Sequence, residues 1–256
     1  MHTMEVNKME KITERKNKEI FVEDKKVIKL FAESHPKSNI LNEALNQARV
    51  EEGSNLNVPK LVEVKKIGSR WALISEYIEG KTISQLMKED PDNFDRYLNL
   101  FVDVQLTILS NSVPMLNRIK EKFTRKLQNA TNIEENTKYE LLERLNGMKN
   151  HTKLCHGDYH PSNVIVRNDG VVYVIDWAHV TQGNASADAA RTYLLFSIDN
   201  QEQLAEKYLN IFSQKSGISK SNIQRWIPIV AATQMTKQIE EEQDFLSKWI
   251  NVVDYE

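Results

Sequence analysis

The sequence predicts an α+β protein in two parts, a small antiparallel sheet over residues 1–79 and a larger helical part over residues 80–256. Short stretches rich in β-branched residues fill the first part, and amphipathic stretches with apolar residues three or four apart dominate the second. The change falls within "ALISEYIEG", which ends at Gly80. A hinge between the two parts is therefore expected near residues 75–80.

The first part is expected to contain a helix among several strands. Strands are predicted over 11–15, 19–23 and 25–31, and two more flank a turn at Gly68. Between them, "HPKSNILNEALNQARV" has helical apolar spacing, with Ser38 or Asn39 as a predicted N-cap. These elements together predict a small antiparallel sheet with one accompanying helix.

Helical periodicity dominates the second part. The predicted helices cover 94–109, 119–127, 139–145, 185–196, 204–212 and 223–250. Pro228 lies inside the last of these stretches and is expected to break or kink it, because proline removes a backbone donor and clashes with the preceding turn.

Composition excludes several classes of protein. The net charge is −2 and the basic residues are scattered, which makes nucleic acid a poor partner. Cys155 is the only cysteine, so no internal disulfide can form, and the first residues lack the apolar core of a signal peptide. The apolar runs are far shorter than the roughly 20 residues that cross a bilayer. We therefore expect a cytoplasmic protein with no membrane span.

One stretch carries most of the chemistry, "HGDYHPSNVIVRNDGVVYVIDW" from His156 to Trp177. Two β-branched runs flank the turn-like "RNDG", which predicts a hairpin. Asp158 and Asn163 precede the first run and Asp176 follows the second, so the hairpin is expected to bring the three together. Two carboxylates and an amide oxygen suit a hard cation such as Mg²⁺.

Three interpretations compete for this cluster. The polar residues could simply cap a turn, or His156, Asp158 and His160 could hold zinc, although no Cys-x-x-Cys pattern supplies further ligands. The third is Mg²⁺-assisted phosphoryl transfer. The order His-x-Asp-x-x-x-x-Asn, then a strand and a further Asp, matches the catalytic loop and metal-binding Asp of kinases. That match favours the third interpretation.

With "VIDW", the motif "HGDYHPSNV" resembles the aminoglycoside phosphotransferase and choline kinase superfamily, the small-molecule kinases related to protein kinases. Gly157 stands where protein kinases have Arg, and "HPSN" and "NASADAARTYLLF" are also similar to segments of that family. The resemblance is strongest from Leu154 to Phe196 and weaker before Gly80. It implies a bilobal, protein-kinase-like fold with a nucleotide-binding lobe over 1–79 and a catalytic loop at 156–163.

The resemblance also implies roles for individual residues. Asp158 would orient or deprotonate the acceptor hydroxyl, while Asn163 and Asp176 would hold Mg²⁺. His156 would support the loop by hydrogen bonds, and Asp188 would brace it. Ser162 and the sequence "DWA" after Val174 and Ile175 depart from relatives without removing a metal or phosphate ligand.

A kinase-like fold needs a Lys on the third strand to hold the α- and β-phosphates, and a Glu on the next helix to orient it. Lys29 lies among apolar residues of the third predicted strand, and Glu43 lies on the helix that follows. Lys25 and Lys26 are competing lysines, but they fall in the turn before that strand. Lys29 and Glu43 are therefore the candidate pair.

The remaining nucleotide contacts are less clearly marked. In the hinge, the Ser75 carbonyl and the Tyr77 amide are the candidate adenine contacts, with the Ile78 amide as an alternative. The first glycine of the chain is Gly53, so no Gly-rich loop can cover the phosphates. The turn in "ERKNKEIF" would serve instead, with charge from Lys16 or Lys18.

The predicted function is ATP-dependent transfer of the γ-phosphate to a hydroxyl of a small molecule, such as an aminoglycoside, an amino alcohol or a sugar-like acceptor, with Mg²⁺ as cofactor and GTP left open as donor. Acidic side chains near the C-terminus either form a solvated helix face or attract a cationic acceptor; they are Glu240, Glu241, Glu242 and Asp244. A catalytically silent kinase-like module that binds a nucleotide or a partner is the alternative. The sequence decides neither the acceptor nor the oligomeric state.

Overall fold

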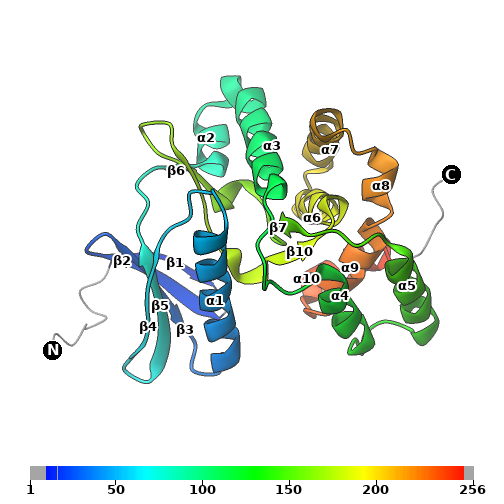
Figure 1. Cartoon of the computed structure of the whole chain (residues 1–256), viewed down its shortest axis with the longest axis horizontal. Helices are drawn as coiled ribbons and strands as arrows, with labels where there is room; N and C mark the ends of the chain where they lie inside the picture. The colour runs from blue at the N-terminus through cyan, green and yellow to red at the C-terminus, as the bar shows by residue number, and fades with distance from the viewer. Residues whose placement is uncertain (1–9, 16, 251–256) are drawn as a thin grey trace. The chain divides into compact units, whose positions relative to one another are not determined.

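The computed structural model describes residues 10–15 and 17–250, and these fall into two compact units. The first unit holds the described residues up to Glu89 together with Ser162–His179, and the second holds Asp90–Pro161 with the described residues from Val180 onward. Figure 1 follows the chain through both units. Among the described residues, no helix combines the length and apolar character that a membrane crossing requires.

A five-stranded antiparallel sheet forms the base of the first unit (Figure 1). Its order is β1-β2-β3-β5-β4. The strands are β1 (Glu10–Arg15), β2 (Lys18–Glu23), β3 (Lys26–Phe31), β4 (Leu61–Ile67) and β5 (Arg70–Glu76). All five lie where the β-branched stretches predicted them, and the mixed α+β class is confirmed.

Alternation along β3 decides which side chains face helix α1 (Lys37–Gly53). Phe31 packs with residues of α1 in one apolar cluster, whereas Ile28 and Leu30 belong to a second cluster that contains no residue of α1. Lys29 shares the parity of Phe31, so the pleat directs its side chain to the α1 face.

Helix α1 begins earlier than the sequence suggested. Its N-cap is Pro36, whose carbonyl accepts hydrogen bonds from the amides of Asn39 and Ile40. Ser38 and Asn39 lie inside the first turn, so the prediction that one of them is the N-cap was wrong. Pro36 has the fixed φ of proline (−59°) and an extended ψ, a geometry that starts the helix without a side-chain cap.

The predicted hairpin belongs to the first unit. Strand β8 (Val164–Val166) pairs with β9 (Val172–Val174) and, on its other side, with β6 (Lys81–Thr82). A Cβ at Gly80, just before β6, would lie 2.5 Å from the Val166 carbonyl oxygen, so only glycine allows this approach. The sequence-based boundary at residue 80 had grouped this hairpin with the helical part, but its β6 pairing lies within the sheet-containing unit.

The second unit is mainly helical. It contains α3 (Phe94–Ser110), α4 (Ile119–Gln128), α5 (Glu135–Gly147), α6 (Ala185–Ile198), α7 (Glu202–Ser216), α8 (Lys220–Gln224), α9 (Ile227–Met235) and α10 (Glu240–Ser247), with the short pair β7 (Lys153–Cys155) and β10 (Thr181–Gly183). Nearly all of α6 is buried, and α6 packs against α7, α8 and α9. The first part of the predicted catalytic loop, up to Pro161, follows β7 and belongs to this unit, whereas Ser162 and Asn163 belong to the first unit.

The stretch predicted as one helix from 223 to 250 is three helices, α8, α9 and α10. Pro228 occupies the first turn of α9, where a proline costs no hydrogen bond. The break expected at this residue is therefore present, and a second break after α9 includes Gln238 at φ 53°.

Candidate active site

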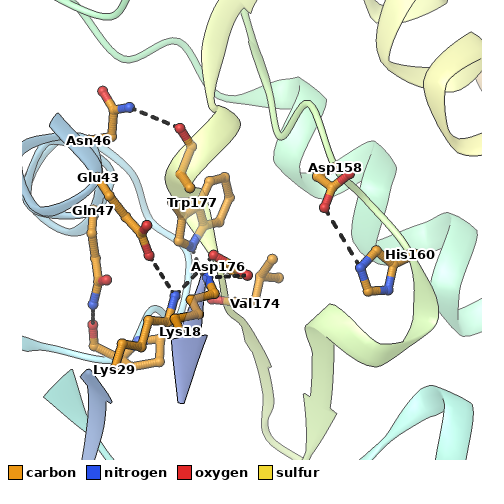
Figure 2. Close-up of polar contacts among 12 residues, drawn as sticks. Lys18, Lys29, Glu43, Asn46, Gln47, Asp158, His160, Val174, Asp176 and Trp177 are labelled. Atoms are coloured by element: carbon orange, nitrogen blue, oxygen red, sulfur yellow. Dashed lines mark hydrogen bonds and ion pairs between the residues drawn. The ribbon is translucent and has the colours of Figure 1, made fainter. Parts of the chain in front are cut away.

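The first unit brings Lys29 and Glu43 into direct contact (Figure 2). The Lys29 Nζ donates to Glu43 Oε1 at 2.7 Å, and only 11% and 9% of the two side chains are exposed. Lys29 comes from β3 and reaches the α1 face by strand alternation. Glu43 lies on the buried stripe of α1 with Ile40 and Ala44. The strand and helix periods thus position this pair together.

Asp176, which follows β9, also contacts Lys29. Its Oδ1 accepts from Lys29 Nζ at 2.9 Å, and its Oδ2 lies 3.6 Å from Lys18 Nζ (Figure 2). Asp176 has φ 65°, a left-handed conformation that is costly outside glycine and that recurs at functional sites. The loop after β9 therefore holds this carboxylate under strain beside two ammonium groups.

The charge of Lys29 is stabilised by its neighbours. Burial by itself lowers the pKa of Lys29, but the carboxylates of Asp176 and Glu43 outweigh burial and raise that pKa above its ordinary value. Lys29 is therefore a fixed cation in a partly dehydrated place. Such a group can bind phosphate oxygens strongly, because water screens it little.

The hairpin brings the backbones of Asn163 and Asp176 together. Val164 pairs with Val174, and the amide of Ile175 donates to the carbonyl of Asn163 at 2.9 Å. Asn163 is buried, whereas 17% of the Asp176 side chain is exposed. One carboxylate and one amide oxygen fit Mg²⁺, which takes one or two protein ligands and completes its shell with phosphate oxygens and water. These two residues could therefore hold the metal of a nucleotide complex.

Asp158 lies in the second unit, on the loop after β7. Gly157 has φ 78°, so this position favours glycine, and its amide donates to Asp188 Oδ1 at 2.7 Å. His156 is fully buried, and its Nδ1 accepts from the Asp158 amide at 3.3 Å. The two residues predicted to support the loop, His156 and Asp188, both contact it. Whether Asp158 meets Asp176 stays a prediction, because the two belong to different units.

Asp188 is itself held by a residue that the sequence did not single out. Gln105 of α3 donates to Asp188 Oδ2 at 3.1 Å, and the Gln105 side-chain oxygen accepts from Tyr208 at 2.6 Å. Burial raises the pKa of Asp188, while the hydrogen bond from the Gly157 amide acts in the opposite direction. Gln105 has the helical spacing of a buried α3 residue, so no local signal distinguished it from its apolar neighbours.

Arg191 is the second functional candidate that sequence reasoning missed. Its Nη2 lies 3.0 Å from Asp158 Oδ1, and His160 Nε2 lies 3.9 Å from the other oxygen of that carboxylate (Figure 2 draws the His160 contact). Arg191 follows Asp188 by three residues on α6, which places both side chains on one helix face. That spacing was a usable signal once Asp188 had been assigned to the loop.

The zinc interpretation finds no support in the geometry. Within residues 10–15 and 17–250, no group of three or more His, Cys, Asp and Glu side chains is arranged to hold a metal ion. His156 is committed to the Asp158 amide through Nδ1. An oxygen-ligated Mg²⁺ carried in with phosphate groups does not require such a group.

The hinge and the β1–β2 turn refine the nucleotide contacts. Ser75 lies inside the sheet, paired with Val27 and Leu61. The Tyr77 amide donates to the Lys25 carbonyl at 2.9 Å, so this donor is already used. Lys18, in the β1–β2 hairpin, lies beside Asp176, whereas Lys16 falls outside the described residues.

Comparison with protein families gives one match that covers most of the chain. The model described as the phosphotransferase enzyme family matches residues 12–218. This range includes the β3 lysine, the α1 glutamate and the loop around Asp158. A search of curated protein sequences found no match.

Solved structures of aminoglycoside phosphotransferases are similar in fold. A thermostable mutant of APH(4)-Ia in a ternary complex with AMP-PNP and hygromycin B has a TM-score of 0.72 at 13% identity, over 96% of this chain and 91% of that one. APH(2'')-Ib bound to ADP has a TM-score of 0.62 at 16% identity, over 96% and 92%. Aminoglycoside-3'-phosphotransferase of type VIII has a TM-score of 0.64 at 14% identity, over 88% and 93%. At these identities the likeness shows the kinase-like fold.

Proposed function

Because the chain belongs to the phosphotransferase enzyme family, we propose that it is a kinase that transfers the γ-phosphoryl group of ATP to a hydroxyl of a small molecule. Four structural neighbours are complexes with ADP, AMP-PNP or ATP, and three of these four also hold hygromycin B or streptomycin. The proposal carries the nucleotide and the small-molecule acceptor over to this chain. The choice of ATP over GTP and a cytoplasmic location stay predictions.

The observation that carries the proposal is the position of Lys29 between the carboxylates of Glu43 and Asp176. Glu43 fixes the lysine, and Asp176 marks where a metal-bound phosphate would lie. In our proposal, Lys29 and Lys18 would bind the phosphates of the nucleotide, and Asn163 and Asp176 would hold Mg²⁺. The Mg²⁺ would neutralise the phosphate oxygens.

Asp158 is the proposed partner of the acceptor hydroxyl. Its carboxylate would accept the hydroxyl proton while the acceptor oxygen bonds to the γ-phosphorus and the bond to the ADP oxygen breaks. ADP leaves with the electron pair of that bond. The ion pair with Arg191 would hold Asp158 in place, and Asp188 would fix the loop through Gly157. Catalysis of this kind depends mainly on positioning and electrostatics.

For adenine, we propose the Ile78 amide as donor in place of the Tyr77 amide. The Tyr77 amide donates to Lys25, whereas within the described residues the Ile78 amide has no hydrogen-bond partner. The Ser75 carbonyl stays the proposed acceptor. Substitution of Ile78 by proline removes its amide and is expected to raise the KM for ATP without changing the acceptor KM.

Asp158→Asn tests the reaction. Loss of a general base commonly lowers the rate about 10²- to 10⁴-fold, so ADP release from Mg·ATP with an acceptor should fall by that factor. The matched control is Asp169→Asn in the exposed hairpin turn, which should leave the rate unchanged. Full activity of Asp158→Asn would show that Asp158 does not take part in the reaction. Failure of Mg·ATP to bind the native protein would contradict the proposed function.

The acidic residues of α10 give little support to a cationic acceptor. Glu240, Glu241 and Asp244 are exposed, and Glu242 accepts from Gln234 at 2.6 Å. None of them contacts Asp158 among the described hydrogen bonds and ion pairs. The charged group that does lie beside Asp158 is the cation of Arg191, opposite in sign to the acidic residues of α10.

A further inference from the structure

Four basic side chains of the second unit form what we call the basic cluster: Lys122, Lys126, Arg191 and Lys237. Lys122 and Lys126 are four residues apart on α4, so they lie on one face of that helix. Arg191 comes from α6, and Lys237 follows α9. Helix α4 packs against α9, which brings residues distant in the sequence to one place.

The cluster adjoins Asp158 and an open pocket. Arg191 pairs directly with Asp158 at 3.0 Å and is only 8% exposed. A pocket of about 480 Å³ is lined by Lys122, Arg125, Lys126, Asn129 and Thr236. Three of these five side chains are basic and the other two are neutral and polar. The charged side chains that line the pocket are therefore all basic.

Like charges and burial make the cluster costly in the protein alone. Burial, followed by the charges of Lys126, Lys237 and Arg191, lowers the pKa of Lys122 to about 7, while Asp158 acts against this. The same causes lower the pKa of Lys126. Burial also lowers the pKa of Lys237, to about 8, but the Lys237 side chain is exposed, whereas Lys122 and Lys126 are half-buried.

Carboxylates act against this repulsion without cancelling it. Asp158 raises the pKa of Lys122, Lys126 and Lys237, and Glu242 raises that of Lys237, yet the pKa of each lysine stays below its ordinary value. A cationic acceptor that approached Asp158 here would meet like charge. An acceptor with an anionic group would relieve the repulsion instead.

We propose that the acceptor carries, besides the hydroxyl that is phosphorylated, an anionic oxygen group, a carboxylate or a phosphate, and that Lys122 and Lys126 bind this group in the pocket beside α4. Arg191 positions Asp158 and adds to the attraction. The inference rests on the proposed function, because it takes Asp158 as the residue that meets the hydroxyl. It goes beyond that function by naming the charge of the acceptor, which is opposite to the cationic class that the acidic residues near the C-terminus left open.

Matched acceptors test the charge preference. ADP release is measured with glycerate, glycerol phosphate, glycerol and serinol, and with gluconate, glucose 6-phosphate, glucose and glucosamine. These sets hold the carbon skeleton nearly constant and vary the charge. We expect the highest kcat/KM with an anionic member, and comparison of the carboxylates with the phosphates identifies the group. A best acceptor that is neutral or cationic overturns the inference.

Charge variants locate the binding group. Lys122→Gln/Lys126→Gln should lower kcat/KM for the anionic acceptor roughly 100-fold, mainly through KM, because it removes two charge-assisted contacts. Lys122→Arg/Lys126→Arg should retain most of the activity. The control, Lys153→Gln/Lys220→Gln, removes two charges from the same unit outside the pocket and should change nothing. Unchanged or improved turnover of the anionic acceptor in the first variant contradicts the assignment.

A binding measurement separates failure of the inference from failure of the proposed function. Thermal unfolding of the native protein and of Lys122→Gln/Lys126→Gln is followed with inorganic phosphate, glycerate or glucose 6-phosphate. If Mg·ATP binds but no tested acceptor is turned over, a larger anion-induced rise in Tm for the native protein supports the basic cluster as the site. Equal rises in both proteins overturn it. If Mg·ATP does not bind the native protein, the proposed function itself is contradicted, whatever the anions do.

Discussion

At the residue scale, the contacts of Lys29 give the clearest indication of function. It is a largely buried cation with two carboxylate partners, Glu43 at 2.7 Å and Asp176 at 2.9 Å. Buried ion pairs contribute little net stability because dehydration of the charges offsets their attraction. Their retention here is better explained by a use for the lysine charge, and phosphate binding is that use in our proposal.

Lys29→Met tests this use. We expect kcat/KM for ATP to fall roughly 100-fold or more, since charge-assisted contacts to phosphate are lost. The variant should also be less stable, because Glu43 and Asp176 are left without their shared cation. Steady-state kinetics and thermal unfolding provide the two readouts. Lys26→Met on the same strand is the control, and an equal loss in both variants would contradict a specific role for Lys29.

Cys155 is the opposite case, a reactive residue type that the fold makes inert. It is fully buried, and burial, followed by the charge of Asp188, raises the pKa of its thiol. Because the thiolate is the reactive form, the native protein should not react with a disulfide reagent over hours, whereas denaturant should release one thiol per chain. Ser84→Cys, on the exposed face of α2 (Ile83–Glu89), is the positive control. Rapid reaction of the native protein would contradict this burial.

At the element scale, the turns that flank the β8–β9 hairpin depend on backbone geometry as much as on side chains. Gly157 adopts φ 78°, and its amide meets Asp188. The same region ends with Asp176 at φ 65°, where a non-glycine residue accepts the strain. Gly157 therefore adopts the left-handed conformation without strain where the loop is fixed to Asp188. Asp176 adopts a similar conformation with strain, because a carboxylate is needed at that position.

Gly157→Ala tests whether backbone strain at this position lowers activity as well as stability. An L-residue in the left-handed region costs about 1–2 kcal/mol, so the variant should be less stable and, with its loop displaced, at least tenfold slower. Gly170→Ala is a matched control, because Gly170 has φ 82° in the hairpin turn and a Cβ there would meet no atom within 4 Å. It should lose similar stability and keep its kcat. Equal loss of kcat in both variants would show that strain alone slows the enzyme.

At the scale of the whole molecule, the cost of the basic cluster should appear in the pH dependence of stability. The pKa of Lys122 in the folded protein is about 7, below its ordinary value of 10.5. Between these values the unfolded chain binds more protons than the folded chain, so stability rises with pH across this range. Below about pH 7 both states are protonated, and the full penalty of the folded charge is present.

Lys122→Met removes that penalty. It should be more stable than the native protein at pH 6, and this advantage should shrink as the pH rises through 7 towards 10. Urea unfolding at pH 6, 8 and 10 measures the difference, with Lys153→Met as a control that shows no such trend. A difference between Lys122→Met and the native protein that does not vary with pH would indicate altered packing instead of an altered charge.

The sequence by itself determined the local features of this protein. The strands and α1 follow from apolar periods of two and of three to four residues, and those periods also placed Lys29 and Glu43 on facing surfaces of β3 and α1. The hairpin that joins Asn163 to Asp176 was readable because a turn-forming "RNDG" lies between two β-branched runs. Each of these features depends on neighbours within a few residues along the chain.

Only the tertiary structure decided which distant groups meet. The Gln105–Asp188 contact and the basic cluster require helices far apart in the sequence to pack at one place, and the Arg191–Asp158 pair requires α6 to meet the loop after β7. The acidic run of α10 left a cationic acceptor open in the sequence, but most of its side chains are exposed to water. Apolar periodicity in a sequence indicates which face of a helix is buried, but it does not indicate which other element packs against that face. The charge around Asp158 was therefore beyond the reach of the sequence, and it points to an anionic acceptor.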